Sequence, residues 1–214
     1  MAIKNACFIS YSHGQYEYTK KFMEDLKKAI QNELDAYLNQ PIYVDEERLK
    51  PGYNWDVSLT RAICESVCMI VVYTPKYDES DYCITEFCAM EKIERERITK
   101  LGESYDNKYR MIIPIILRRP KILPEKIKKI QHINDFSKYT LYSTEITMSP
   151  DFEPIIRQIV EVIYEIYCML KQDPDLFEHE NCTNFTAPSL DEIQNSWGKF
   201  KEKPKFPPKF PGRI

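Results

Sequence analysis

Residues 67–73, with the sequence VCMIVVY, form the most convincing strand of the chain, and Thr74-Pro75 ends it. Four further runs are predicted strands, and most of them are almost as apolar: residues 6–11, 41–45, 111–117 and 133–136. Strands of this kind are buried on both faces, which is typical of parallel sheets. Pro114 predicts a place where the hydrogen-bond ladder of its strand is interrupted.

Segments with apolar residues at helical spacing separate these strands. They are residues 17–38, 55–65, 80–97, 123–130 and 152–170. The alternation predicts an α/β fold, with a doubly wound, flavodoxin-like, five-stranded parallel sheet and helices on both faces. Ligands bind such sheets at the carboxyl ends of the strands. Function is therefore expected in the loops at residues 11–15, 45–55 and 75–86.

The composition is that of a globular protein with one core. The chain has 214 residues, 43% of them hydrophobic and 29% charged, which excludes disorder throughout and fibrous repeats. Its net charge of −3 gives no reason to expect nucleic acid or an anionic membrane as a partner. No apolar stretch reaches the roughly 20 residues that cross a bilayer, and the first residues lack a signal peptide's apolar region. We therefore expect a cytoplasmic protein.

The cysteines predict a reduced protein. Seven are present, most of them in apolar runs: Cys7, Cys64, Cys68, Cys83, Cys88, Cys168 and Cys182. In a reducing compartment this pattern indicates buried free thiols. No pair has the C-x-x-C spacing of zinc sites, and the three histidines are scattered. We expect neither a disulfide nor a bound metal.

Several function classes lack their sequence signatures. The chain has five glycines, with no G-x-G-x-x-G after its first strand and no G-x-x-x-x-G-K-[ST], which excludes Rossmann-type dinucleotide binding and P-loop phosphate binding. A phosphoacceptor domain needs acidic residues after the first strand and an aspartate after the third, where this chain has SYS (10–12) and YTP (73–75). No G-x-S-x-G elbow is present, and no local pattern pairs a cysteine with a base.

Two charged segments each allow a structural and a functional interpretation. Residues 91–97 (EKIERER) suit a solvated helix face with ion pairs one turn apart better than a binding patch. The tail at 199–211 interleaves lysine, phenylalanine and proline, so it cannot form a helix or a central strand. This composition can bind single-stranded nucleic acid, but we favour a flexible or docked extension. The expected division is a domain at 1–172 and an extension at 173–214.

Three sequence boxes resemble those of Toll/interleukin-receptor (TIR) domains. FISYS at residues 8–12 resembles the first box, and LKPG at 49–52 with Trp55 resembles the BB loop. SDYCITEF at residues 80–87 resembles the helix start where the family shows Trp-Cys-x-x-Glu-Leu, with Tyr82 in place of the tryptophan. The boxes occur in family order, and the resemblance extends over residues 6–170.

The resemblance implies one of two functions. Enzymatic TIR domains cleave NAD+ between nicotinamide and ribose, giving ADP-ribose or a cyclic ADP-ribose-type signal. Stand-alone bacterial members, Thoeris-like ones included, act in antiphage defence. Other members are non-catalytic scaffolds that recruit further TIR domains through the BB loop. We favour the NAD+ glycohydrolase or cyclase, which needs no cofactor, self-associates through TIR–TIR contacts and supplies a nucleotide product to a downstream effector.

The family's catalytic glutamate corresponds to Glu86. Nicotinamide leaves NAD+ as a neutral base, so one carboxylate facing an oxocarbenium-like ribose suffices. The alternative is that Glu86 only interacts with the dipole at the start of its helix. The candidate substrate-binding residues are Ser10, Tyr11, Ser12, Asp45, Trp55, Ser80 and Tyr82, each of which can instead end a strand, cap a loop or pack the fold.

Overall fold

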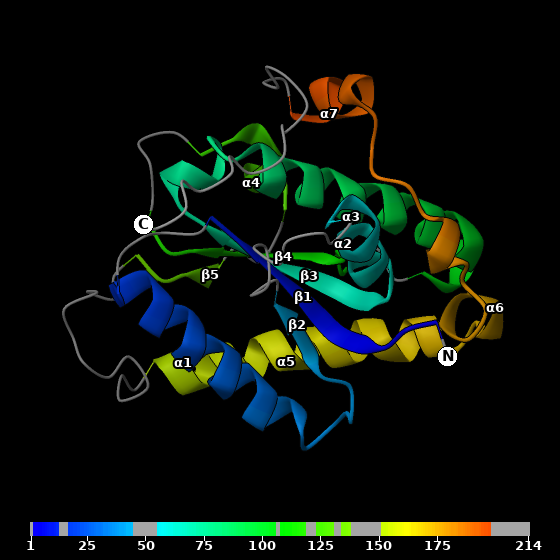
Figure 1. Ribbon diagram of the computed structural model, residues 1–214. Coiled ribbons are helices and arrows are strands. Elements are labelled where there is room, and N and C mark those ends of the chain that lie inside the picture. Colours follow the sequence, from blue (N-terminus) through cyan, green and yellow to red (C-terminus); the bar gives the residue numbers. More distant parts are fainter. Residues whose placement is uncertain are drawn as a thin grey trace, which may run out of the picture.

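The fold was obtained as a computed structural model that describes residues 2–12, 17–44, 55–105, 108–118, 123–130, 134–137 and 151–197. Five parallel strands form one sheet: β1 (Asn5–Tyr11), β2 (Ile42–Val44), β3 (Ser66–Tyr73), β4 (Ile112–Ile116) and β5 (Asn134–Asp135). Their order is β2-β1-β3-β4-β5 (Figure 1). This order and the parallel pairing confirm the predicted doubly wound α/β fold.

Helices cover both faces of this sheet. They are α1 (Glu17–Leu34), α2 (Trp55–Cys64), α3 (Asp81–Leu101), the short α4 (Glu125–Lys128) and α5 (Phe152–Lys171). In Figure 1, α1 and α5 lie side by side on one face, and α2 and α3 lie on the other. A single 3-10 turn, η1 (Pro75–Tyr77), connects β3 to α3. None of these helices combines the length and apolar character needed to cross a membrane.

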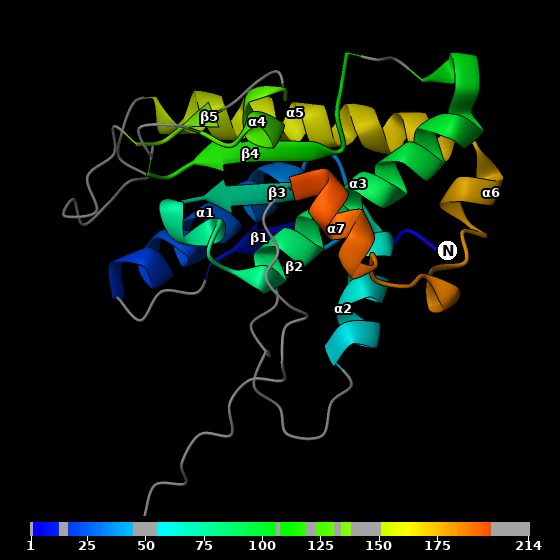
Figure 2. The same cartoon turned by 90° about the horizontal axis from the view of Figure 1, so that it is seen from above.

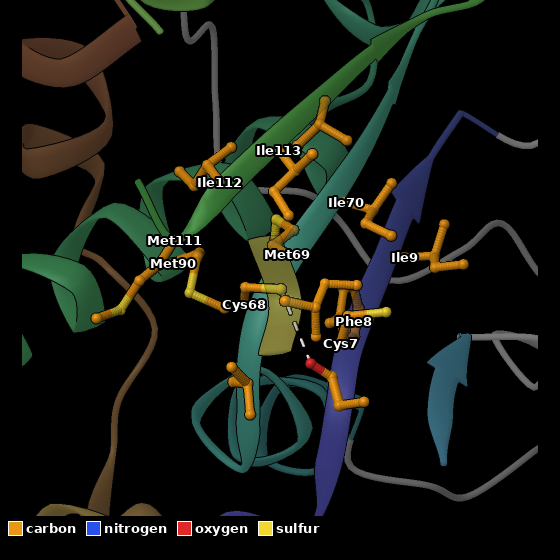
Figure 3. Close-up of a cluster of buried hydrophobic side chains, with 14 of the residues drawn as sticks. Cys7, Phe8, Ile9, Cys68, Met69, Ile70, Met90, Met111, Ile112 and Ile113 are labelled. Carbon is orange, nitrogen blue, oxygen red and sulfur yellow. Dashed lines mark hydrogen bonds between the residues drawn. The ribbon is translucent and has the colours of Figure 1, made fainter. Parts of the chain in front are cut away.

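The centre of the core lies between β1, β3 and β4 (Figure 3). Every residue of β3 and β4 is buried, as expected for strands covered on both faces. Cys7 and Cys68 are register partners on adjacent strands. Burial raises the pKa of both thiols, so they remain protonated and unreactive. These two cysteines are among the four buried thiols outside the disulfide, as the sequence predicts.

Pro114 lies at the centre of β4 and is the register partner of Val71 in β3. The described residues of β5 pair with Ile115 and Ile116. Residue 133, which is next in this register, lies outside the described residues, so the interrupted ladder at Pro114 stays a prediction.

The segment after α5 folds back over the domain. It contains α6 (Pro174–Phe177), a 3-10 turn at Cys182–Asn184, and α7 (Leu190–Trp197), which lies over α3 (Figure 2). The sequence did not predict α7, because three large apolar residues in eight give a weak periodic signal. Ile193 packs on Ile84 and Cys88 of α3. The proline-rich tail beyond this helix lies outside the described residues.

A disulfide joins this C-terminal segment to the domain, so the prediction of a chain without disulfides is wrong. Cys64, the last residue of α2, bonds Cys182 across a sequence separation of 118 residues. Sequence spacing could not indicate this pair, because the two thiols meet only once the segment after α5 has docked. The other five cysteines form no disulfide.

We expect this disulfide to contribute to stability. Cross-linking residues so far apart restricts the unfolded chain, and such bonds typically stabilise by about 2–4 kcal/mol. Cys182→Ser, or reduction, should therefore lower the melting temperature by roughly 5–15 °C in a protein of this size. The control is Cys168→Ser, which removes a free thiol. Equal melting temperatures with and without reductant would contradict the prediction.

The charged run at residues 91–97 is not wholly solvated, which corrects the expectation for it. Glu94 and Arg97 are buried, at 1% and 0% exposure. Glu94 accepts hydrogen bonds from the Arg110 side chain at 2.6 Å and from the Met111 N–H at 2.7 Å. These two charges lie on the face of α3 turned toward the sheet and the C-terminal segment, where each has a bonded partner.

Candidate active site

The carboxyl end of β1 presents three polar residues. Ser10 is buried, at 1% exposure, while Tyr11 and Ser12 are half-buried. The Ser12 hydroxyl lies 3.1 Å from the Thr74 hydroxyl, which follows β3. Because adjacent parallel strands end at the same edge of a sheet, β1 and β3 bring these side chains together at the edge where doubly wound folds bind ligands.

Helix α3 begins beside this edge. The Ser80 hydroxyl is its N-cap and accepts a hydrogen bond from the Cys83 N–H at 3.3 Å. Asp81 is the acidic residue of the first turn. Glu86 lies in the second turn, past the region where the helix dipole acts most strongly. It is fully buried, at 0% exposure, which distinguishes it from a carboxylate placed at a helix start for its charge alone.

Glu86 is bonded to the end of β1. The Ser10 hydroxyl donates to the Glu86 carboxylate oxygen Oε2 at 2.5 Å. The Tyr77 hydroxyl lies 2.8 Å from the Ser10 oxygen. Sequence reasoning missed Tyr77, although its place directly after Thr74-Pro75, at the carboxyl end of the strongest strand, is a position where functional residues gather.

The Glu86 side chain lines a pocket of about 20 Å³. Residues of α2 form one wall, and Ala187, which precedes α7, contributes to the lining: the residues around Glu86 are Leu59, Thr60, Ile63, Thr85, Ala89 and Ala187. This volume is about that of one water molecule. Among the described residues, Glu86 is the one ionisable group of this lining. Because its side chain is fully buried, a charge placed beside it meets little solvent screening.

The predicted site residues fall into three groups. Ser10 and Glu86 are bonded to each other, and Ser80 caps the helix that carries Glu86. Tyr11, Ser12 and Tyr82 are half-buried near the ends of β1 and α3. Trp55 begins α2, but its side chain lies outside the described residues, as does all of Asp45 together with residues 46–54, which resemble the BB loop.

A larger cavity of about 190 Å³ lies at the other end of the strands, where β4 and β5 begin. Ile112 and Asn134, at the amino ends of β4 and β5, line it together with Gln158 of α5. Among the described residues that line it, the ionisable groups are Lys108, Tyr109, Arg110 and Lys129, and none of them is a carboxylate. It therefore lacks the group that the predicted chemistry requires, and we place the candidate site at Glu86.

One group of potential metal ligands occurs among the residues that the structure describes. It consists of Cys64, Glu180 and Cys182, whose ligand atoms lie within 4.8 Å of one another. Both cysteines are joined in the disulfide, and Glu180 is bonded to Arg97 at 2.8 Å. The disulfide leaves no thiolate to bind a metal, and the Arg97 guanidinium already pairs with the Glu180 carboxylate, so this group does not suit a metal ion.

Residues 7–146 match the family model described as "TIR domain". The chain belongs to the TIR domain family. Among solved structures it is similar to the TIR domains of the activated Roq1 resistosome directly recognizing the pathogen effector XopQ, with 18% identity over 88% of this chain and 95% of that chain and a TM-score of 0.38. That likeness is too weak to carry an argument about function. The comparison with curated proteins finds no match.

Proposed function

We propose that this TIR domain is an NAD+ glycohydrolase or ADP-ribosyl cyclase and that Glu86 is its catalytic residue. The observation that carries the proposal is a fully buried carboxylate at the carboxyl edge of a parallel sheet, fixed by the Ser10 hydroxyl and lining a pocket. Membership of the family, in which enzymes cleave the bond between nicotinamide and ribose, supplies the reaction class.

Burial makes one carboxylate sufficient for this chemistry. When nicotinamide leaves, positive charge develops on the ribose, and a carboxylate about 4 Å away attracts it by about 1 kcal/mol in water. At the effective dielectric constant of about 20 found in proteins, the same attraction is about 4 kcal/mol. Only the second value accounts for a rate effect of 100-fold or more, which corresponds to about 2.7 kcal/mol.

Substrate entry requires the pocket to widen. At about 20 Å³ it does not accommodate a nicotinamide ribose. Its walls are α2 and the segment before α7, so opening between these two is part of the proposal. Tyr11, Ser12 and Tyr82 are half-buried and are proposed to contact the ribose or nicotinamide, together with Asp45 and Trp55.

Incubation of the purified chain with NAD+, followed by chromatographic separation of the products, tests this function. We expect release of nicotinamide with ADP-ribose or a cyclic isomer as the second product. Intact NAD+ at every protein concentration tested would overturn the proposal and leave the second interpretation, an interaction module that recruits other TIR domains. Placement in bacterial antiphage defence, with a downstream effector that senses the product, is a further part of the proposal.

We also propose self-association, and it predicts a concentration dependence. The segment at 46–54, which resembles the BB loop, lies next in sequence to α2, the wall of the Glu86 pocket. If a second copy contributes to opening or completing the site, the specific activity should rise with protein concentration. Rates and sedimentation across one dilution series measure this. A constant specific activity from a monomeric protein would contradict the prediction.

A further inference from the structure

Tyr77 contacts both elements that hold Glu86. Its hydroxyl lies 2.8 Å from the Ser10 oxygen at the end of β1, and it donates to the Cys83 carbonyl at 3.1 Å. Ser10 is the residue that donates to Glu86, and Cys83 lies one turn before Glu86 in α3. The Tyr77 hydroxyl therefore connects Ser10, which is hydrogen-bonded to the Glu86 carboxylate, with the turn of α3 that precedes Glu86.

The donor and the acceptor of each hydrogen bond among Tyr77, Ser10 and Glu86 follow from the number of hydroxyl protons. Ser10 has one hydroxyl proton, and it goes to Glu86, so at the 2.8 Å contact the Ser10 oxygen accepts from Tyr77. Burial raises the pKa of Tyr77, and Cys83 and Glu86 raise it further, so the phenol keeps its proton. The one phenolic proton is shared by two acceptors, the Ser10 oxygen and the Cys83 carbonyl, in a three-centre hydrogen bond. Without it, the Ser10 hydroxyl can rotate away from the carboxylate.

Tyr77 is itself held rigidly. It is fully buried, its backbone N–H donates to the Thr74 carbonyl at 2.8 Å, and its ring packs against Tyr73 and Trp197 at centroid distances of 5.8 and 6.3 Å. Because the ring is fixed in this way, the Tyr77 hydroxyl has a defined position and can hold Ser10 and the Cys83 carbonyl in place.

We propose that Tyr77 is a positioning residue for Glu86, acting through Ser10 and the first turn of α3. The inference rests on the proposed function, because the consequence of positioning is the rate of NAD+ cleavage. A carboxylate that drifts from its place loses part of its attraction for the ribose. A misplacement of about 1 Å can cost 100-fold in rate, so loss of one guiding hydrogen bond should cost about 10-fold.

The test compares Tyr77→Phe with Tyr73→Phe. Both remove only a hydroxyl from a buried ring, but the Tyr73 hydroxyl donates to Asp78 at 2.6 Å and has no bond to Ser10. We expect Tyr77→Phe to lower kcat about 10-fold with little change in KM, and Tyr73→Phe to leave both near the wild-type values. One outcome would overturn the positioning role and leave the proposed function intact. In that outcome the wild type is active, Glu86→Gln is inactive, and Tyr77→Phe has the kcat and KM of the wild type.

A second measurement needs no activity. If Tyr77 and Glu86 are connected through Ser10, the shifts in melting temperature caused by Tyr77→Phe and Glu86→Gln should not add in the double variant. The shifts caused by Tyr73→Phe and Glu86→Gln should add. Additive shifts for the Tyr77 pair would overturn the inference, whether or not the wild type cleaves NAD+.

Discussion

Glu86→Gln is expected to slow nicotinamide release by at least about 100-fold. Glutamine keeps the size and shape of the side chain, and its amide oxygen can still accept the hydrogen bond that Ser10 donates at 2.5 Å. It removes the negative charge that would face the developing positive charge of the ribose. Since the pocket around Glu86 offers little solvent screening, the lost attraction is large. Nicotinamide release and melting temperature should be measured on the same preparations.

The control for this variant is Glu96→Gln. Glu96 is on the same helix, α3, but is exposed, so the identical chemical change should leave the cleavage rate near that of the wild type. The melting temperature of Glu86→Gln should also stay close to the wild-type value, because the substitution leaves no cavity. A Glu86→Gln variant that melts normally and cleaves NAD+ at nearly the wild-type rate would remove Glu86 from the catalytic role.

The sheet could be predicted from the sequence because its strands have a characteristic apolar pattern. Parallel strands covered on both faces are apolar at almost every position, and β3 and β4 are buried throughout. The bounds were less accurate where the chain turns: α1 ends at Leu34, four residues earlier than predicted, and β5 ends at Asp135, one residue earlier than predicted. Element ends depend on local caps and tertiary contacts, which periodicity does not report.

The hydrogen-bonded part of the candidate site could be predicted only in part. The family boxes pointed to Ser10 and Glu86, but nothing in the sequence indicated that the first donates to the second, or that Tyr77 joins them. These contacts join β1, η1 and α3, which come together only in the folded chain. Sequence spacing reports neighbours along one element, whereas a polar network depends on the distances between elements.

The sequence did contain a signal for the burial of Arg97. This residue follows Ile93 by four residues and Met90 by seven, which is the spacing of the buried stripe of α3. The run of mixed charges around it favoured a solvated face instead. A charged residue at a stripe position implies either exposure or a complete set of partners, and the sequence alone cannot say which. In the structure its partners are complete.

Arg97→Ala is expected to lower the free energy of unfolding by about 3–5 kcal/mol, the usual cost of leaving one member of a buried ion pair alone. The guanidinium, at 0% exposure, bonds Glu180 at 2.8 Å and donates to the carbonyls of Cys64, Ser66 and Val67. Its loss leaves a nearly buried carboxylate and removes a donor from three backbone carbonyls. It also removes one of the ion pairs that, beside the disulfide, attach the C-terminal segment to the domain.

Urea unfolding of Arg97→Ala against Arg95→Ala measures this effect. Arg95 is exposed on the same helix, so its substitution should change stability by no more than about 0.5 kcal/mol. Glu180→Gln is the milder partner variant: it leaves the arginine with its three carbonyls and should cost less than Arg97→Ala. If Arg97→Ala unfolds at the same urea concentration as Arg95→Ala, the ion pair does not stabilise the fold, and the disulfide and the other contacts of the C-terminal segment retain it without Arg97.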